Sequence, residues 1–118
     1  MTTISVTGEQ RFHILNLLPQ ESGSLQESIQ IKRMRDQVTF SDDEKEKIGI
    51  DEETGSFNPS ALKDVDKKKV EFSENEERIL AGAFVKKEEE GNVPTDDAFV
   101  ELALKIEDKI KDFREDLD

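Results

Sequence analysis

Apolar side chains recur at helical spacing in several segments, and each segment follows a pair of residues typical of a helix start. In such a pair a Ser or Thr hydroxyl accepts a hydrogen bond from the amide three residues later, and the Glu or Gln there reaches back to the first amide. Four pairs have this spacing: Thr7 with Gln10, Ser24 with Glu27, Ser41 with Glu44, and Ser73 with Glu76. They predict helices over about 8–18, 25–37, 42–48 and 74–90.

The last part of the chain carries the most regular amphipathic pattern. Its apolar residues follow the spacing that places them on one face of a helix: Phe99, Leu102, Ala103, Ile106, Ile110, Phe113 and Leu117. The pattern predicts one long fifth helix that begins after Pro94-Thr95. We expect this face to pack against the helix at 74–90. The alternative is that part of it docks a partner helix or a second copy of the chain.

The segment 51–66 has no helical pattern, and its turn formers Thr54-Gly55 and Asn58-Pro59 predict a loop or an irregular hairpin. At 67–72 Val70 and Phe72 alternate with charged residues, as in a short strand. Together these patterns predict a mainly α-helical fold, with about five helices in one small domain over 1–118 and a short β-hairpin as a minor α+β variant. The ends, 1–6 and 115–118, are expected to be frayed.

The apolar positions of these elements predict one shared core. Phe40 and Phe72 each end a Val-x-Phe segment directly before a capped helix, and we expect both to anchor the core there. The residues expected to be buried together are Leu15, Leu18, Phe40, Phe72, Leu80, Phe84, Phe99, Leu102 and Ile106.

Charge and composition exclude several classes of function. Of the 118 residues 29 are acidic and 17 are basic, and the net charge of −12 arises wholly within 41–118. The absence of Cys excludes disulfides, thiolate zinc sites and thiol catalysis. No apolar run is long enough for a transmembrane helix, so no membrane contact is expected. The first residues lack the basic and apolar regions of a signal peptide, and we expect the protein to reside in the cytoplasm.

Two dense acidic clusters are the candidate partner-binding residues. They comprise Asp42, Asp43 and Glu44, and Glu88, Glu89 and Glu90, all at predicted helix ends. An acidic face attracts a cationic protein surface and can mimic nucleic acid; the alternative is that these charges only confer solubility. Direct nucleic-acid binding is not expected, because phosphate contacts need cations and the basic runs at 32–35 and 67–69 lack interleaved aromatic residues.

Residues that could perform catalysis or hold a metal are sparse. The single histidine, His13, lies between Phe12 and Ile14 and is expected at the edge of the core or in solvent. The segment 51–55 superficially resembles a calcium loop, but position 12 of such a loop would be Leu62 instead of an acid. No nucleophile elbow, phosphate loop or zinc-protease motif occurs. We therefore expect no enzyme, no cofactor and no metal site.

The opening of the first predicted helix, Glu-Gln-Arg-Phe-His-Ile-Leu-Asn-Leu-Leu-Pro at 9–19, resembles a group of small uncharacterised proteins of tailed bacteriophages and prophages. Their typical opening is E-R-x-x-L-L-x-x-L-P, followed by a second helix and by a phenylalanine with Ser or Thr and acidic residues. The segments 38–44 and 70–74 are similar to those later parts. The resemblance covers about residues 8–90 and departs at the long charged C-terminal helix. It implies a phage origin and no catalytic residues.

These observations lead to one expected function with two alternatives. We expect a non-enzymatic, acidic protein-binding factor, a phage-encoded accessory or host-interaction protein in the cytoplasm of the host bacterium. The first alternative is an acidic nucleic-acid mimic that occupies a DNA- or RNA-binding protein. The second is a small self-associating assembly protein of a phage particle, for which the chain would form a homo-oligomer. The sequence does not identify the protein partner.

Overall fold

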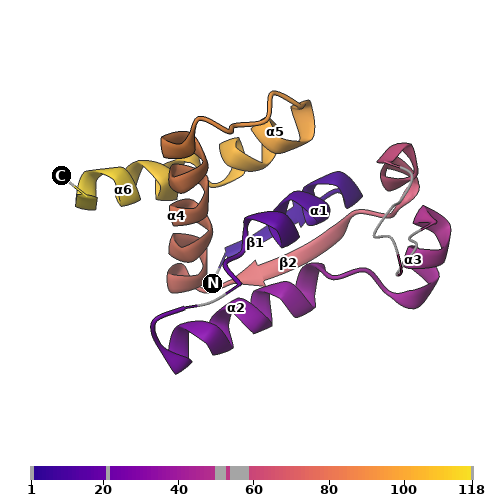
Figure 1. Ribbon diagram of the computed structural model, residues 1–118, viewed down its shortest axis with the longest axis horizontal. Coiled ribbons are helices and arrows are strands. Elements are labelled where there is room, and N and C mark those ends of the chain that lie inside the picture. Colours follow the sequence, from indigo (N-terminus) through magenta and orange to yellow (C-terminus); the bar gives the residue numbers. More distant parts are fainter. Residues whose placement is uncertain (1, 21, 50–52, 54–58, 118) are drawn as a thin grey trace.

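The computed structural model describes residues 2–20, 22–49, 53 and 59–117. Within them, six α-helices, a short 3-10 helix and a two-stranded sheet form one small, mainly helical domain, as the sequence predicts (Figure 1). The elements in chain order are β1 Thr2–Val6, α1 Gly8–Leu17, α2 Leu25–Val38, α3 Asp42–Ile48, the 3-10 helix η1 Pro59–Asp64, β2 Lys68–Phe72, α4 Glu74–Glu90, α5 Asp97–Lys105 and α6 Glu107–Leu117.

All four predicted capping residues begin helices. Thr7, Ser41 and Ser73 each form both hydrogen bonds of a capping box. Ser24 makes only the forward bond, in which its hydroxyl accepts from the amide of Glu27. Because these bonds join residues three apart, the sequence alone is enough to locate the helix starts.

Removing the Ser73 hydroxyl should destabilise the protein by about 0.5–2 kcal/mol, because the N-terminal amides of α4 lose an acceptor. Ser73 Oγ accepts from the amide of Glu76, and the Ser73 amide donates to Glu76 Oε1 at 2.8 Å. Urea unfolding of Ser73→Ala measures the loss. Ser24→Ala, which removes one bond of a more exposed cap, should lose less, and the exposed Thr95→Ala serves as control. Equal losses for Ser73→Ala and Thr95→Ala would contradict the cap.

The predicted strand at 67–72 exists as β2, but its partner differs from the predicted hairpin. β2 pairs antiparallel with β1, from Thr2 opposite Phe72 to Val6 opposite Lys68. The expectation of a frayed end at 1–6 is therefore wrong for Thr2–Val6. Val6 is fully buried, so burial of the inward residues holds this strand in place. Of the predicted loop at 51–66, Pro59–Asp64 forms η1, while 51, 52 and 54–58 lie outside the described residues.

The predicted long C-terminal helix is divided at Ile106. Its backbone leaves the helical conformation (φ −122°, ψ 23°), and α5 and α6 lie on either side. The apolar stripe continues across the break, with Leu102, Ile106 and Ile110 all buried. The break has a physical reason, because α5 packs mainly on α1 whereas α6 packs crosswise against α4 (Figure 1). At the C-terminal end, expected to fray at 115–118, α6 extends to Leu117, and Asp118 lies outside the described residues.

The buried apolar residues form two clusters instead of one. Seven of the nine expected core residues share the larger cluster: Leu18, Phe72, Leu80, Phe84, Phe99, Leu102 and Ile106. Phe40 instead packs with Ile48, Leu62 and Val65 in the smaller cluster between α3 and η1. Leu15 is half-buried and contacts both clusters. The single predicted core is thus corrected: α1 lies between two cores, and Phe40 anchors the second.

Candidate protein-binding surfaces

The first predicted acidic cluster is divided between solvent and the fold. Asp42 and Asp43 are exposed in the first turn of α3. Glu44 accepts hydrogen bonds from both terminal nitrogens of Arg11, at 2.6 and 3.0 Å, and from the amide of Ser41. The Arg11 hydrogen bond lowers the pKa of Glu44 to about 2, assisted by Ser41 and opposed by burial. Glu44 therefore stabilises the fold, and only Asp42 and Asp43 remain available to a partner.

Arg11 is the buried cation that this arrangement satisfies. It is 2% exposed, its Nε donates to the carbonyl of Val38 at 3.1 Å, and its Nη2 donates to the carbonyl of Thr39 at 2.7 Å. Its guanidinium also lies 4.5 Å from the centre of the Phe40 ring. This role was missed from the sequence. The available signal was that Arg11 shares the apolar face of α1, three residues before Ile14.

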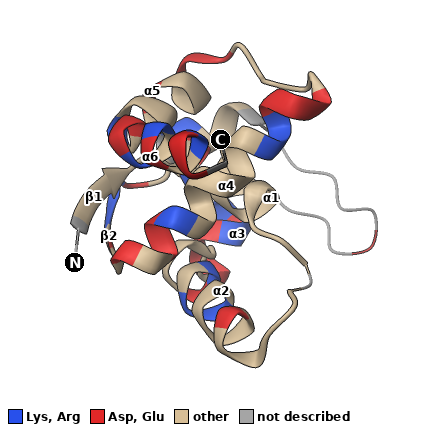
Figure 2. Ribbon diagram, turned by 90° about the vertical axis from the view of Figure 1, so that its left-hand side faces the viewer, with Lys and Arg blue, Asp and Glu red and all other residues tan. Residues whose placement is uncertain are grey.

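The second predicted acidic cluster lies at the end of α4. Glu88 forms an ion pair with Arg114 of α6, whereas Glu89 and Glu90 are exposed. α3 and the end of α4 lie apart in Figure 1, so the two clusters do not form one face. Figure 2 shows acidic and basic residues interleaved over several helices. Over these helices the acidic residues thus alternate with basic ones instead of forming one acidic block.

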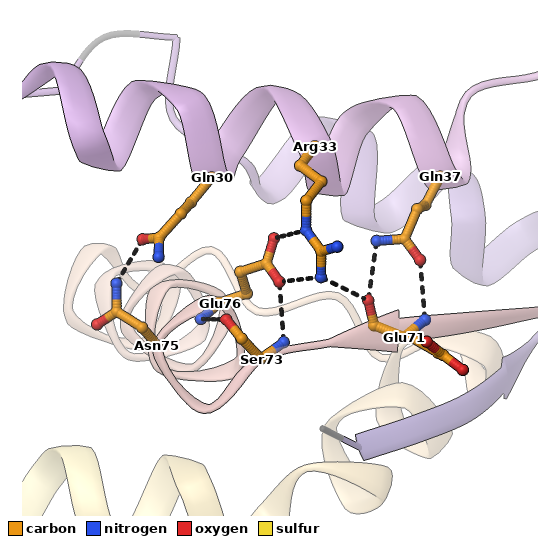
Figure 3. Close-up of polar contacts among 7 residues, drawn as sticks. All are labelled: Gln30, Arg33, Gln37, Glu71, Ser73, Asn75 and Glu76. Carbon is orange, nitrogen blue, oxygen red and sulfur yellow. Dashed lines mark hydrogen bonds and ion pairs between the residues drawn. The ribbon is translucent and has the colours of Figure 1, made fainter.

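A second polar network joins α2 to the start of α4 (Figure 3). Arg33 donates to both carboxylate oxygens of Glu76, at 2.9 and 2.7 Å, and Glu76 is 1% exposed. Burial acts to raise the pKa of Glu76, but hydrogen bonds from Arg33 and Ser73 outweigh it and the pKa is lowered. Asn75 donates to Gln30 on the same side of α2. These side chains form their hydrogen bonds with one another, so we assign them a structural role.

His13 lies at the edge of the core, as expected. Its Nε2 is 2.7 Å from Asp96 Oδ2, and its ring meets the edge of Phe99 with 5.2 Å between centroids. Asp96 is also the N-cap of α5, where its Oδ1 accepts from the amide of Phe99. The pair therefore attaches α1 to the start of α5.

An open groove of about 450 Å³ lies between the α1–α2 connection and α4. Its apolar lining includes Leu17, Leu18, Pro19, Ile79 and Ala83, and its charged lining includes Glu27, Arg78, Lys86, Lys87 and Glu90. Gly82 also lines the groove, and the ring of Phe113 from α6 lies against it, so an added Cβ at Gly82 would be 3.0 Å from that ring. α6 therefore borders the groove at Gly82, and Ile79 and Ala83 continue its lining along α4.

Two further apolar pairs are exposed on helices. Leu25 and Ile29 lie four residues apart on α2 and are 79% and 60% exposed. Val100 and Leu104 have the same spacing on α5 and are 44% and 59% exposed. Leu25 and Ile29 follow the apolar pattern of their helix in the sequence, but the buried face of α2 is formed by Ile31, Met34 and Val38.

No group of three or more His, Asp or Glu side chains that could hold a metal ion occurs in the described ranges. Among the helices that the structure describes, none is both long and apolar enough to cross a bilayer. The chain matches no protein-family model, no curated protein and no solved structure. The surfaces themselves are therefore the basis from which a function is inferred.

Proposed function

We propose that this chain is a non-enzymatic protein-binding factor that holds an amphipathic segment of its partner in the groove beside α4. The observation that carries the proposal is the open groove, which combines an apolar lining with cations on α4. Apolar surface that becomes buried on association supplies most of the free energy, and charges at the rim set orientation and association rate.

The lining specifies the chemistry of the partner. Ile79 and Ala83 are half-buried and offer an apolar strip along α4. Lys86 and Lys87 follow one turn later, and neither forms an ion pair with another described residue, whereas Arg78 is paired with Asp116 at 2.6 Å. We therefore propose a partner segment that places apolar side chains over Ile79 and Ala83 and a carboxylate against the lysines.

The alternatives have less support. A nucleic-acid mimic needs a continuous row of carboxylates, and the exposed acids of the two predicted clusters, Asp42 with Asp43 and Glu89 with Glu90, lie on separate elements (Figure 1). A self-associating assembly protein would use an exposed apolar face, for which α5 offers Val100 and Leu104. The phage origin is part of the proposal and is supported by the sequence resemblance at 9–19, 38–44 and 70–74. It would place the partner in the bacterial cytoplasm.

A displayed random-peptide library tests the groove even though the partner is unidentified. We expect peptides selected on the wild type to combine apolar residues at helical spacing with acids. Ala83→Arg, which fills the groove, and the double variant Lys86→Glu/Lys87→Glu should each weaken these peptides by at least about tenfold, a change of about 1.4 kcal/mol. The matched control is Lys111→Glu on α6, an exposed lysine outside the groove.

Three outcomes would count against the proposal. Peptides that bind the groove variants as well as the wild type would place recognition elsewhere. Peptides that are basic, and lose affinity when Asp42 and Asp43 become lysine, would favour the acidic mimic. A concentration-dependent oligomer in sedimentation velocity that is disrupted by Leu104→Lys would favour the assembly role.

A further inference from the structure

The two edges of the two-stranded sheet differ in whether another element covers them. β2 has its outer edge covered by α2: the Gln37 side chain donates to the carbonyl of Glu71 and accepts from its amide, both at 2.8 Å. The side-chain amide thereby takes the place that a third strand would occupy (Figure 3). Arg33 also reaches the Glu71 carbonyl, at 3.4 Å.

The same contacts fix the direction of the backbone groups of β1. Because Glu71 uses its amide and carbonyl away from β1, its cross-strand neighbour Thr3 is in a pair that does not exchange backbone hydrogen bonds. Thr3 therefore directs its amide and carbonyl to the outer edge, and so does Ser5, two residues on. The Ser5 carbonyl confirms this, because it accepts from Lys105 Nζ at 2.5 Å.

The remaining outward groups of β1 have no partner among the described residues. The structure gives no hydrogen bond to the Thr3 amide, the Thr3 carbonyl or the Ser5 amide beyond the sheet pairing, and both residues are exposed. Figure 2 shows β1 as the outermost element on its side of the molecule. β1 thus presents an open row of donors and acceptors that another extended chain can complete.

A local excess of positive charge lies beside this edge. Lys67 and Lys105 line a shallow recess of about 270 Å³ together with Ile4 and Ser5. Lys68 and Lys69 continue the run on β2, where Lys69 lies opposite Ser5. Desolvation lowers the pKa of Lys105, the charge of Glu101 opposes this, and the nearby charge of Lys67 adds to it. Two lysine charges therefore converge on one recess in a chain whose net charge is −12.

We infer that the outer edge of β1 binds an extended acidic peptide segment of another protein, which adds a third strand to the sheet with its carboxylates against Lys67, Lys69 and Lys105. Backbone hydrogen bonds to the amide and carbonyl of Thr3 and to the amide of Ser5 supply the strand pairing, and the lysines select the acidic sequence. This site is separate from the groove beside α4 and does not depend on it.

Charge repulsion argues against a second copy of β1 as the occupant of this edge. Pairing two copies through this edge would bring two sets of these lysines together, which like-charge repulsion opposes. The lysines could instead only protect the edge from aggregation, as edge lysines often do. That protection is usually carried by the edge strand itself, and Thr2–Val6 contains neither a charged residue nor proline.

The test uses a fluorescein-labelled peptide that alternates glutamate with valine, and a matched peptide with lysine in place of glutamate. In anisotropy titrations the glutamate peptide should bind the wild type, more weakly at high salt, and at least about tenfold more tightly than the lysine peptide. Lys67→Glu/Lys69→Glu should lose this binding by a similar factor. Thr3→Pro should also lose it, because proline removes an outward amide that β2 does not use. Lys111→Glu, an exposed lysine on α6 that lines neither this recess nor the groove, is the control and should bind normally.

Amide hydrogen exchange gives a readout that charge alone would not change. Peptide binding should slow exchange at Thr3 and Ser5, while the amide of Ile4 between them changes little. Circular dichroism checks that each variant is folded, and the lysine variant decides the case if Thr3→Pro does not fold. Equal affinity for both peptides, no binding at millimolar concentration, or unchanged exchange at Thr3 and Ser5 would overturn the inference. Dimerisation through β1, in the wild type or only once the lysines are replaced, would overturn it too.

Discussion

Arg11→Met is expected to lower the free energy of unfolding by about 3–5 kcal/mol, the range for breaking a buried ion pair by removing one partner. Arg11 is 2% exposed and donates to Glu44 and to the carbonyls of Val38 and Thr39. Methionine keeps much of the apolar stem but leaves those acceptors without their donor. Urea unfolding followed by circular dichroism measures the loss. A domain of this size has only about 5–15 kcal/mol in total, so the variant should be close to unfolding.

The pH dependence of the unfolding free energy distinguishes the contribution of the Arg11–Glu44 ion pair from that of packing. The folded pKa of Glu44 is about 2, below its ordinary value of 4.5, so its ionised form favours the folded state. This stabilisation is fully present above about pH 4.5 and is lost as the pH falls towards 2. Arg11→Met should therefore reduce the change of unfolding free energy across that window. Arg35→Met, which removes a half-buried arginine with one 3.5 Å bond to Pro19, is the control. An unchanged pH profile in Arg11→Met would show that the Glu44 pair contributes little.

Phe99→Ala should cost about 3–5 kcal/mol, from lost transfer energy and the cavity left behind. Phe99 is 3% exposed, and its ring lies edge-on to Phe84 at 5.0 Å and to His13 at 5.2 Å between centroids. Thermal and urea unfolding measure the effect, and Phe84→Ala should give a similar loss.

The neighbouring residue gives a matched control for Phe99. Val100 follows it in α5 but is 44% exposed, so Val100→Ala should change stability by about 0.5 kcal/mol or less. If Phe99→Ala and Val100→Ala melted at the same temperature, the orientation of α5 described above would be wrong.

Local interactions are the part of this fold that the sequence predicts well. The helix starts at Thr7, Ser41 and Ser73 follow from contacts between residues three apart. The partner of β2 could not be predicted in the same way, because Val6 and Lys68 meet only in the folded chain. The break at Ile106 was hidden for another reason. The apolar stripe has the same spacing in one helix as in two, and only the positions of α1 and α4 require the chain to turn.

At the predicted acidic clusters, too, the sequence predicts local features and not long-range contacts. Exposure of Asp42 and Asp43 follows from their polarity and their place in a first turn. The engagement of Glu44 does not, because its partner Arg11 lies on another helix, thirty-three residues earlier. A sequence rich in acids gives no indication of which carboxylates have a buried cation. The groove beside α4 was likewise invisible, since it depends on where the α1–α2 connection passes.

The pairing of β1 with β2 delays formation of the sheet during synthesis of the chain. About sixty residues separate the two strands, so at roughly 5–20 residues per second β1 leaves the ribosome several seconds before its partner. During that interval Ile4 and Val6 have no sheet to join, and α1 lacks the α4 surface on which its apolar face packs. The larger core can therefore form only after α4, α5 and α6 have been synthesised. A nascent chain halted before residue 68 would leave β1, an uncharged segment rich in β-branched residues, exposed to binding by chaperones.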